Sequence, residues 1–203
     1  MTTTRDYIRS VELPAPARGP QRGREATFGS GQEAVVVAAQ MAEFTPKVPQ
    51  ATRPALSHGL LLGQLAAEKA AGESGDIFRW YDAYGLVMRK IGWLLQDIDF
   101  DDRQLTQADL NVHKAIIPVI TTILGPAASA ASIILSVLNG LEQMDKESPW
   151  LTLYQRKSMA AQGGKFQMSY IDAGPGGGVS LKTAFFGVDA QRAVTQILFF
   201  RFS

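Results

Sequence analysis

The stretch KAIIPVITTILGPAASAASIILSVLNGLE, residues 114–142, decides how the chain can fold. Between Lys114 and Glu142 lie 27 residues without a single charged side chain. A helix that spans a bilayer needs about 20 predominantly apolar residues, so this segment is long enough by count. It therefore belongs either to a membrane or to the driest part of a protein core.

Two prolines argue against one spanning helix. Pro118 lies a turn inside the start of the segment, and Gly125-Pro126 falls near its middle, where a proline favours an extended residue before it. We expect two helices, 112–124 and 126–141, of 13 and 16 residues. At about 1.5 Å per residue neither spans a bilayer comfortably.

The second half of this segment is apolar on nearly all sides, which is typical of a helix that is buried on nearly all sides. Small residues from Ala127 to Ser132 permit close helix packing in water or in lipid. Three interpretations follow: a central hairpin of a soluble domain, a concealed hairpin that unpacks and inserts into a bilayer, or a permanent anchor. We expect a core hairpin, for which membrane insertion requires a conformational change.

The N-terminal part predicts an arm followed by helices. Residues 1–31 are rich in Pro and Arg and are expected to form an extended arm outside a single domain, 32–203. The apolar run 33–45 fits a buried strand or a short buried helix, and its Ala and Met residues favour a helix. Residues 54–72 predict a second helix with Pro54 at its start.

The third predicted helix, 74–98, has an apolar stripe at helical spacing that includes Trp80 and Trp93. Its aromatic residues fit a ligand cage or a membrane belt, but the core face of an amphipathic helix explains them more simply. The alternating aspartates of 97–102 lack the Gly and Glu of a calcium loop, so we interpret them as a helix-ending acidic turn.

The C-terminal part predicts strands. Four runs, 150–157, 164–173, 179–188 and 195–203, are rich in β-branched and aromatic residues. The second and third alternate apolar and polar residues, the pattern of an antiparallel sheet with one buried face, and GPGGG joins them as a hairpin loop. We expect the last run, an aromatic one, to lie centrally in the sheet or to pair with another copy of the chain.

Composition excludes several classes of function. With 20 basic and 19 acidic residues the chain lacks the basic field of a nucleic-acid-binding protein, so no nucleic-acid partner is expected. It has no cysteine and only two histidines, which argues against thiol catalysis and metal sites. No nucleophile, base or phosphate-loop motif occurs, so we predict a protein that is not an enzyme, without catalytic residues, cofactor or metal. No signal peptide is evident, so we expect cytoplasmic synthesis and, if the protein is exported, a non-classical route.

Leucine, alanine and aromatic residues follow one another in a set order along about 140 positions, at Leu61, Leu62, Gln64, Leu65, Ala66, Ala67, Trp80, Tyr81, Tyr84, Ile91, Gly92, Trp93, Phe199, Phe200 and Phe202. This set resembles a family of bacterial and fungal proteins. Its members are similar to the Evf virulence factor of insect-gut bacteria, a palmitoylated α/β protein. The resemblance implies a virulence-type activity directed at a host or competitor, but it does not extend to acylation, because this chain has no cysteine.

These observations predict an α+β fold, in which N-terminal helices and a central buried helical hairpin pack on a C-terminal antiparallel sheet of about four strands. The functional hypothesis is a non-enzymatic, virulence or toxin-like protein that contacts lipid membranes through the hairpin 115–141. The alternative is an assembly protein, a homo-oligomer joined through its sheet edge and aromatic C-terminal strand. The candidate membrane- or partner-contacting residues are Ile116, Ile117, Ile120, Ile123, Leu124, Ile133, Ile134, Val137, Leu138, Trp80 and Trp93.

Overall fold

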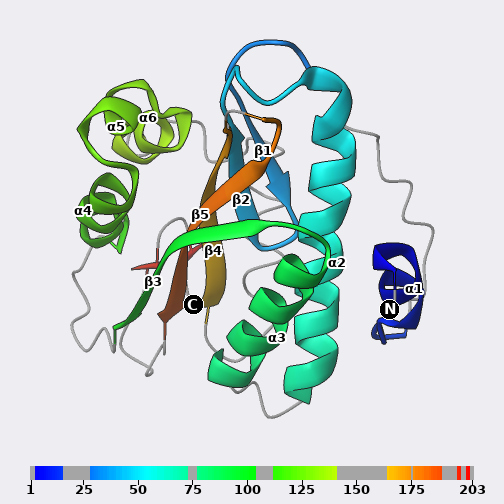
Figure 1. Cartoon of the computed structure of the whole chain (residues 1–203). Coiled ribbons are helices and arrows are strands. Elements are labelled where there is room, and N and C mark those ends of the chain that lie inside the picture. Colours follow the sequence, from blue (N-terminus) through cyan, green and yellow to red (C-terminus); the bar gives the residue numbers. More distant parts are fainter. Residues whose placement is uncertain are drawn as a thin grey trace.

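The protein is an α+β domain built on a five-stranded mixed sheet with helices on both faces (Figure 1). The computed structural model describes residues 3–15, 28–72, 77–103, 112–140, 164–174, 176–188, 196–197 and 200–201. The main elements are β1 (Glu33–Val37), β2 (Gln40–Phe44), α2 (Arg53–Ala71), α3 (Ile77–Lys90), β3 (Leu94–Arg103), α4 (Val112–Leu124), α5 (Pro126–Ala131), α6 (Ile133–Gly140), β4 (Gly164–Ala173) and β5 (Val179–Val188), with the short helices α1 (Thr4–Ser10) and η1 (Gln50–Thr52).

The strand order is β1-β2-β4-β5-β3, so the sheet is mixed and not antiparallel throughout. The hairpins β1–β2 and β4–β5 are antiparallel, as predicted for the second, whereas β2 pairs in parallel with β4 and β3 pairs in parallel with β5. The predicted α+β class is therefore confirmed. The strands of the sheet do not all come from the C-terminal part, because the N-terminal part supplies three of them.

The expectation of a helix over 33–45 is wrong, because this run forms the hairpin β1–β2. The two residues between the strands make a tight turn in which Ala38 has a positive φ of 51°. The three valines 35–37 suit a half-buried strand, and this preference outweighs the helix preference of the alanines that follow. Every side chain of β2 is buried.

The third predicted helix ends earlier than expected, at Lys90. Gly92 has a φ of 99°, and the Trp93 amide donates to the Met88 carbonyl oxygen while the Gly92 amide donates to that of Arg89. This is the hydrogen-bond pattern of a Schellman motif, which terminates a helix at a left-handed glycine. The acidic residues 97–102 accordingly lie in strand β3 and not in a turn.

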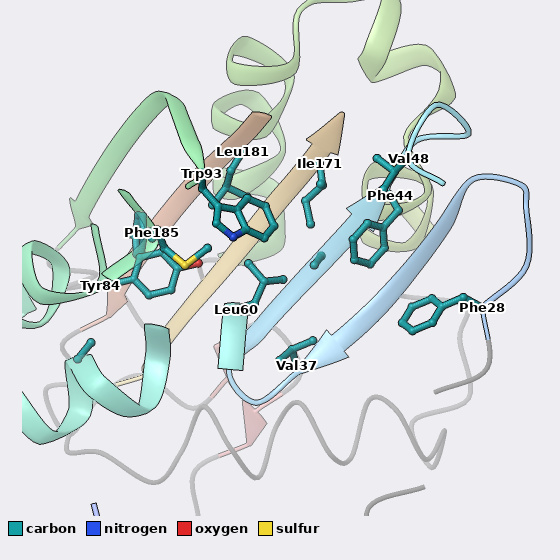
Figure 2. Packing of buried hydrophobic residues seen from close by; sticks show 13 residues of the cluster. Phe28, Val37, Phe44, Val48, Leu60, Tyr84, Trp93, Ile171, Leu181 and Phe185 are labelled. Atoms are coloured by element: carbon teal, nitrogen blue, oxygen red, sulfur yellow. The ribbon is translucent and has the colours of Figure 1, made fainter. Parts of the chain in front are cut away.

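Both faces of the sheet are covered, so the predicted one-face-buried pattern is wrong. On one face α2 and α3 pack over Phe44, Ile171 and Leu181, as Figure 2 shows, and on the other face α4 and α6 pack over Met41 and Met168. Of the polar residues in this alternation, Gln167 and Ser169 are buried under α2 and α3, whereas Ser180 and Lys182 are half-buried on the face covered by α4 and α6. Ser169 belongs to a buried hydrogen-bonded network with Gln40, Gln64, Tyr84 and Thr183.

The arm is neither fully extended nor wholly outside the core. Helix α1 starts with a capping box between Thr3 and Asp6 and buries no residue. Phe28 lies in the core, where its ring meets that of Phe44 edge to face at a centroid distance of 5.7 Å. The core therefore begins before residue 32.

The C-terminal run does not join the main sheet in the described residues. Its strands β6 (Gln196–Ile197) and β7 (Phe200–Arg201) pair with each other in a separate two-stranded sheet, so the expected central position is wrong. The run 150–157 and the residues Phe199 and Phe202 lie outside the described part of the chain.

Helices α2 and α3 approach each other closely at Gly63. A Cβ added there lies 3.0 Å from both Met88 Sδ and Tyr84 Cε2, which is tighter than most Cβ contacts in folded proteins, so these two buried side chains would have to shift. We therefore expect Gly63→Ala to lower the free energy of unfolding by about 1–3 kcal/mol, measured by urea denaturation, despite the better helix propensity of alanine.

Gly85→Ala on α3 is the matched control. The nearest neighbours of the added Cβ there are the guanidinium atoms at the end of the flexible Arg89 side chain, the closest at 3.4 Å. Alanine at this position is expected to leave stability unchanged or to raise it by up to about 1 kcal/mol. Equal losses in both variants would contradict close packing at Gly63.

Candidate functional site: the interface between the hairpin and the sheet

The uncharged segment forms three short helices on one face of the sheet (Figure 1). The predicted break is confirmed, because α4 ends at Leu124 and Gly125 adopts a φ of 74° before Pro126 opens α5. The predicted second helix is divided at Ser132, which is extended with φ −70° and ψ 124°. We refer to α4, α5 and α6 together as the hairpin.

The hairpin turns its isoleucines and leucines to the sheet. Its candidate contact residues are buried together against Met41, Met168 and Phe186. Ile117 and Ile133 are half-buried, and the side chain of Val137 lies outside the described part. The buried candidates are Ile116, Ile120, Ile123, Leu124, Ile134 and Leu138.

The two candidate tryptophans lie elsewhere. Trp93 is buried and Trp80 half-buried in the cluster between the sheet and α2–α3, on the opposite face from the hairpin. Trp80 stacks on Tyr84 with a centroid distance of 5.4 Å, which is the core packing that we favoured for these rings. The structure therefore does not bring the tryptophans and the hairpin into one surface.

No described helix is both long enough and apolar enough to cross a membrane. Several polar side chains of the hairpin donate hydrogen bonds to carbonyl oxygens one turn earlier in the same helix. The bonds are Thr121 to Ile117 at 2.7 Å, Thr122 to Pro118 at 2.9 Å, Ser129 to Gly125 at 2.7 Å and Asn139 to Leu135 at 2.9 Å. These hydroxyl and amide groups have their partners within the hairpin itself.

Glu43 is the main polar connection between the sheet and the hairpin. It lies in β2 and is completely buried. Its Oε1 accepts from the Ile133 amide at 2.9 Å, and its Oε2 accepts from the Ile134 amide at 3.0 Å and from Ser132 Oγ at 2.8 Å. The Gln32 side-chain amide donates to it as well. A carboxylate at the start of a helix also interacts favourably with the helix dipole, so Glu43 caps α6 from a distant strand.

Lys182 makes a contact of opposite charge at the C-terminal end of α4. From β5 its Nζ donates to the carbonyl oxygen of Ile123, near the C-terminus of α4, at 3.2 Å. A cation near a helix C-terminus is stabilising for the same reason that an anion is stabilising at the N-terminus. The sheet thus presents an acid to the start of α6 and a base to the end of α4.

Sequence reasoning missed both residues. Glu43 was visible as a carboxylate between apolar residues, Ala42 and Phe44, in the run 33–45, a position where a buried charge requires donors. Lys182 was visible as the only lysine in the strand 179–188. Neither signal identifies the partner, because the bonded groups are backbone atoms about 60 and 90 residues away in the chain.

Two hollows lie beside these contacts. A cavity of about 10 Å³, room for about one water, lies between Glu43, Ser132 and Tyr170. A larger open groove of about 350 Å³ lies beside it, and Tyr170, Leu124 and Lys182 line both. Burial raises the pKa of Tyr170, and the nearby Asp172 and Glu43 add to this, so its phenol stays protonated at neutral pH.

The described residues contain no cluster of His, Asp or Glu placed to hold a metal ion. No family model, curated protein or solved structure matches the chain. The resemblance to Evf-like proteins therefore stays a prediction. Of the residues that carry it, Gln64, Tyr84 and Trp93 are buried in the core, as expected for packing positions.

Proposed function

We propose that this is a non-enzymatic protein of the virulence or toxin type, which acts on lipid membranes by releasing the hairpin α4–α6 from the sheet. The observation that carries the proposal is the internal bonding of the hairpin. Its threonines, Ser129 and Asn139 bond carbonyl oxygens of their own helices, so these groups keep their partners when the hairpin leaves the sheet. In lipid, where no water replaces a lost bond, this lowers the cost of transfer.

The apolar side of the hairpin supports the same transition. Its buried isoleucines and leucines are out of water against the sheet and would remain out of water in hydrocarbon. The hydrogen bonds that a membrane does not reproduce include those to Glu43 and Lys182 of the sheet and the bond from the Gln32 side-chain amide to the Ala131 carbonyl oxygen. Glu43 and Lys182 therefore act as latches that keep the hairpin on the sheet.

The lengths of the helices limit how they can insert. The 13 residues of α4 measure about 20 Å, against about 30 Å for the hydrocarbon core of a bilayer. We expect the helices to lie in the interface of one leaflet, with their apolar faces in the acyl region.

The test is dye leakage from liposomes with Glu43→Gln. The variant removes the charge and turns an amide N–H₂ toward groups that themselves donate, so it weakens the latch. We expect faster leakage than with the wild type, together with faster amide exchange confined to α4–α6. Because the chain has no cysteine, a fluorophore on Ser136→Cys, an exposed position of α6, reports transfer into lipid.

Glu33→Gln is the matched control. Glu33 lies on the neighbouring strand β1 and pairs with the buried Arg53 at 2.8 Å, under α2 and not under the hairpin. This variant loses stability without loosening α4–α6, so it is expected to leak like the wild type. A Glu43→Gln protein with a loosened hairpin that neither leaks dye nor transfers the fluorophore into lipid would refute the proposal.

The alternative function, assembly, has one observation in its favour. In the described part of the chain β1 pairs only with β2, and its residues 34–37 are apolar, which suits edge-to-edge pairing with a second copy. Size-exclusion chromatography with light scattering separates the two functions. A stable oligomer without lipid favours assembly, whereas a monomer that associates only on liposomes favours membrane action.

A further inference from the structure

The groove beside the hairpin has the properties of a binding site. Its volume of about 350 Å³ lies within the range of small-molecule pockets. It is walled by the strands β4 and β5 on one side and by Leu124 and Ala128 of the hairpin on the other. It therefore combines a polar floor with an apolar wall.

Most of the polar groups around the groove are hydrogen-bond donors. Lys47 and Lys182 contribute ammonium groups, and Tyr170 and Ser180 contribute hydroxyl groups. Among the described residues of the lining Asp172 is the only carboxylate, and its Oδ1 already accepts from Thr45 Oγ1 at 2.6 Å. Donors in excess of acceptors, two of them cationic, favour an anionic ligand.

One of these donors is easily redirected. Lys47 Nζ lies 3.4 Å from Asp172 Oδ2, and the Lys47 side chain is 71% exposed. An exposed ion pair of this kind contributes little to stability, so Lys47 can turn from Asp172 to a ligand at small cost. Asp172 then keeps its bond to Thr45.

We infer that this groove binds a phosphate group, with Lys47 and Lys182 as its cationic contacts and Leu124 and Ala128 beside an attached apolar chain. The phosphate can come from a lipid headgroup or from free phosphate in solution. This inference goes beyond the proposed function, because binding in the groove does not require the hairpin to leave the sheet.

The test is titration of the isotope-labelled full chain with inorganic phosphate by NMR. We expect shifts at residues around the groove, weaker affinity by about three- to ten-fold in Lys47→Gln, and stronger affinity by a similar factor in Asp172→Asn, which removes the competing carboxylate. Lys69→Gln, an exposed lysine of α2, should bind like the wild type. Lys47 is exposed, so its variant is expected to fold.

A second arm identifies the source of the phosphate. Sedimentation with phosphatidylcholine vesicles, with and without phosphatidic acid, measures headgroup binding. Binding that needs phosphatidic acid and is lost in Lys47→Gln supports the inference with a lipid ligand, and binding of inorganic phosphate alone supports it with a soluble one. No binding in either arm, or affinity that falls in Asp172→Asn, would overturn it. Leakage by Glu43→Gln in the absence of phosphate binding would leave the proposed function standing and remove this site.

Discussion

Replacing Glu43 with alanine is expected to lower the free energy of unfolding by about 3–5 kcal/mol. The substitution leaves four donors without their acceptor: the amides of Ile133 and Ile134, the Ser132 hydroxyl and the Gln32 amide. Because the site is buried and the adjacent cavity of about 10 Å³ has room for about one water, solvent cannot replace the carboxylate fully. Urea denaturation measures the loss.

Glu43→Gln provides the comparison for this prediction. One acceptor oxygen remains in the variant, so we expect a smaller loss than in Glu43→Ala, and amide exchange should place the loss in α4–α6. A loss below about 1 kcal/mol in Glu43→Ala would show that the hairpin is held by its apolar contacts alone. The hydrogen bonds to Glu43 would then contribute little to holding the hairpin on the sheet.

Arg53→Ala is expected to cost a similar amount, about 3–5 kcal/mol, on the opposite face of the sheet. The side chain is completely buried at the start of α2 and donates to the carbonyl oxygens of Val48 and Thr45 and to Glu33 Oε2, at 3.2, 3.1 and 2.8 Å. It also lies over the ring of Phe44, 5.7 Å from its centroid. Alanine removes all four contacts at once. Thermal or urea unfolding measures the effect.

Lys47→Ala is the control for Arg53, since it removes the exposed ion pair with Asp172 and is expected to cost less than about 1 kcal/mol. Arg53→Lys should retain part of the stability, because one ammonium cannot reach three acceptors in the geometry of a guanidinium. Equal losses in the free energy of unfolding for Arg53→Ala and Lys47→Ala would contradict this prediction, because the buried guanidinium would then stabilise the fold no more than an exposed ion pair does.

The parts of the fold that were predictable are those with local signals. Gly125-Pro126 marks the end of α4 because a proline restricts the residue before it. The alternation of apolar and polar residues in 164–173 and 179–188 predicts two strands, and the glycine-rich loop between them predicts that they form the hairpin β4–β5. The class of fold follows from these two signals together.

The parts that were not predictable depend on distant partners. An apolar run such as 33–45 is compatible with a helix or a strand. It forms strands here because its second half, β2, pairs with the distant strand β4. The stripe of the third helix continues into β3 without a change in composition, so only Gly92 marks the boundary. The second half of the hairpin is interrupted at Ser132, where Glu43 of another element supplies the cap.

The strand order affects how the chain folds while it is being synthesised. In the five-stranded sheet the hairpin β1–β2 and the strand β3 are not neighbours, because β2 pairs with β4 and β3 pairs with β5, and β4 and β5 are made last of the five. As the chain leaves the ribosome, the apolar faces of α2, α3 and the helices 112–140 have no completed sheet to cover until residues 164–188 emerge. Such long-range pairing folds slowly and leaves apolar surface open to chaperones. The nascent chain therefore passes through a long interval in which the most apolar helices of the protein are accessible before its sheet can close over them.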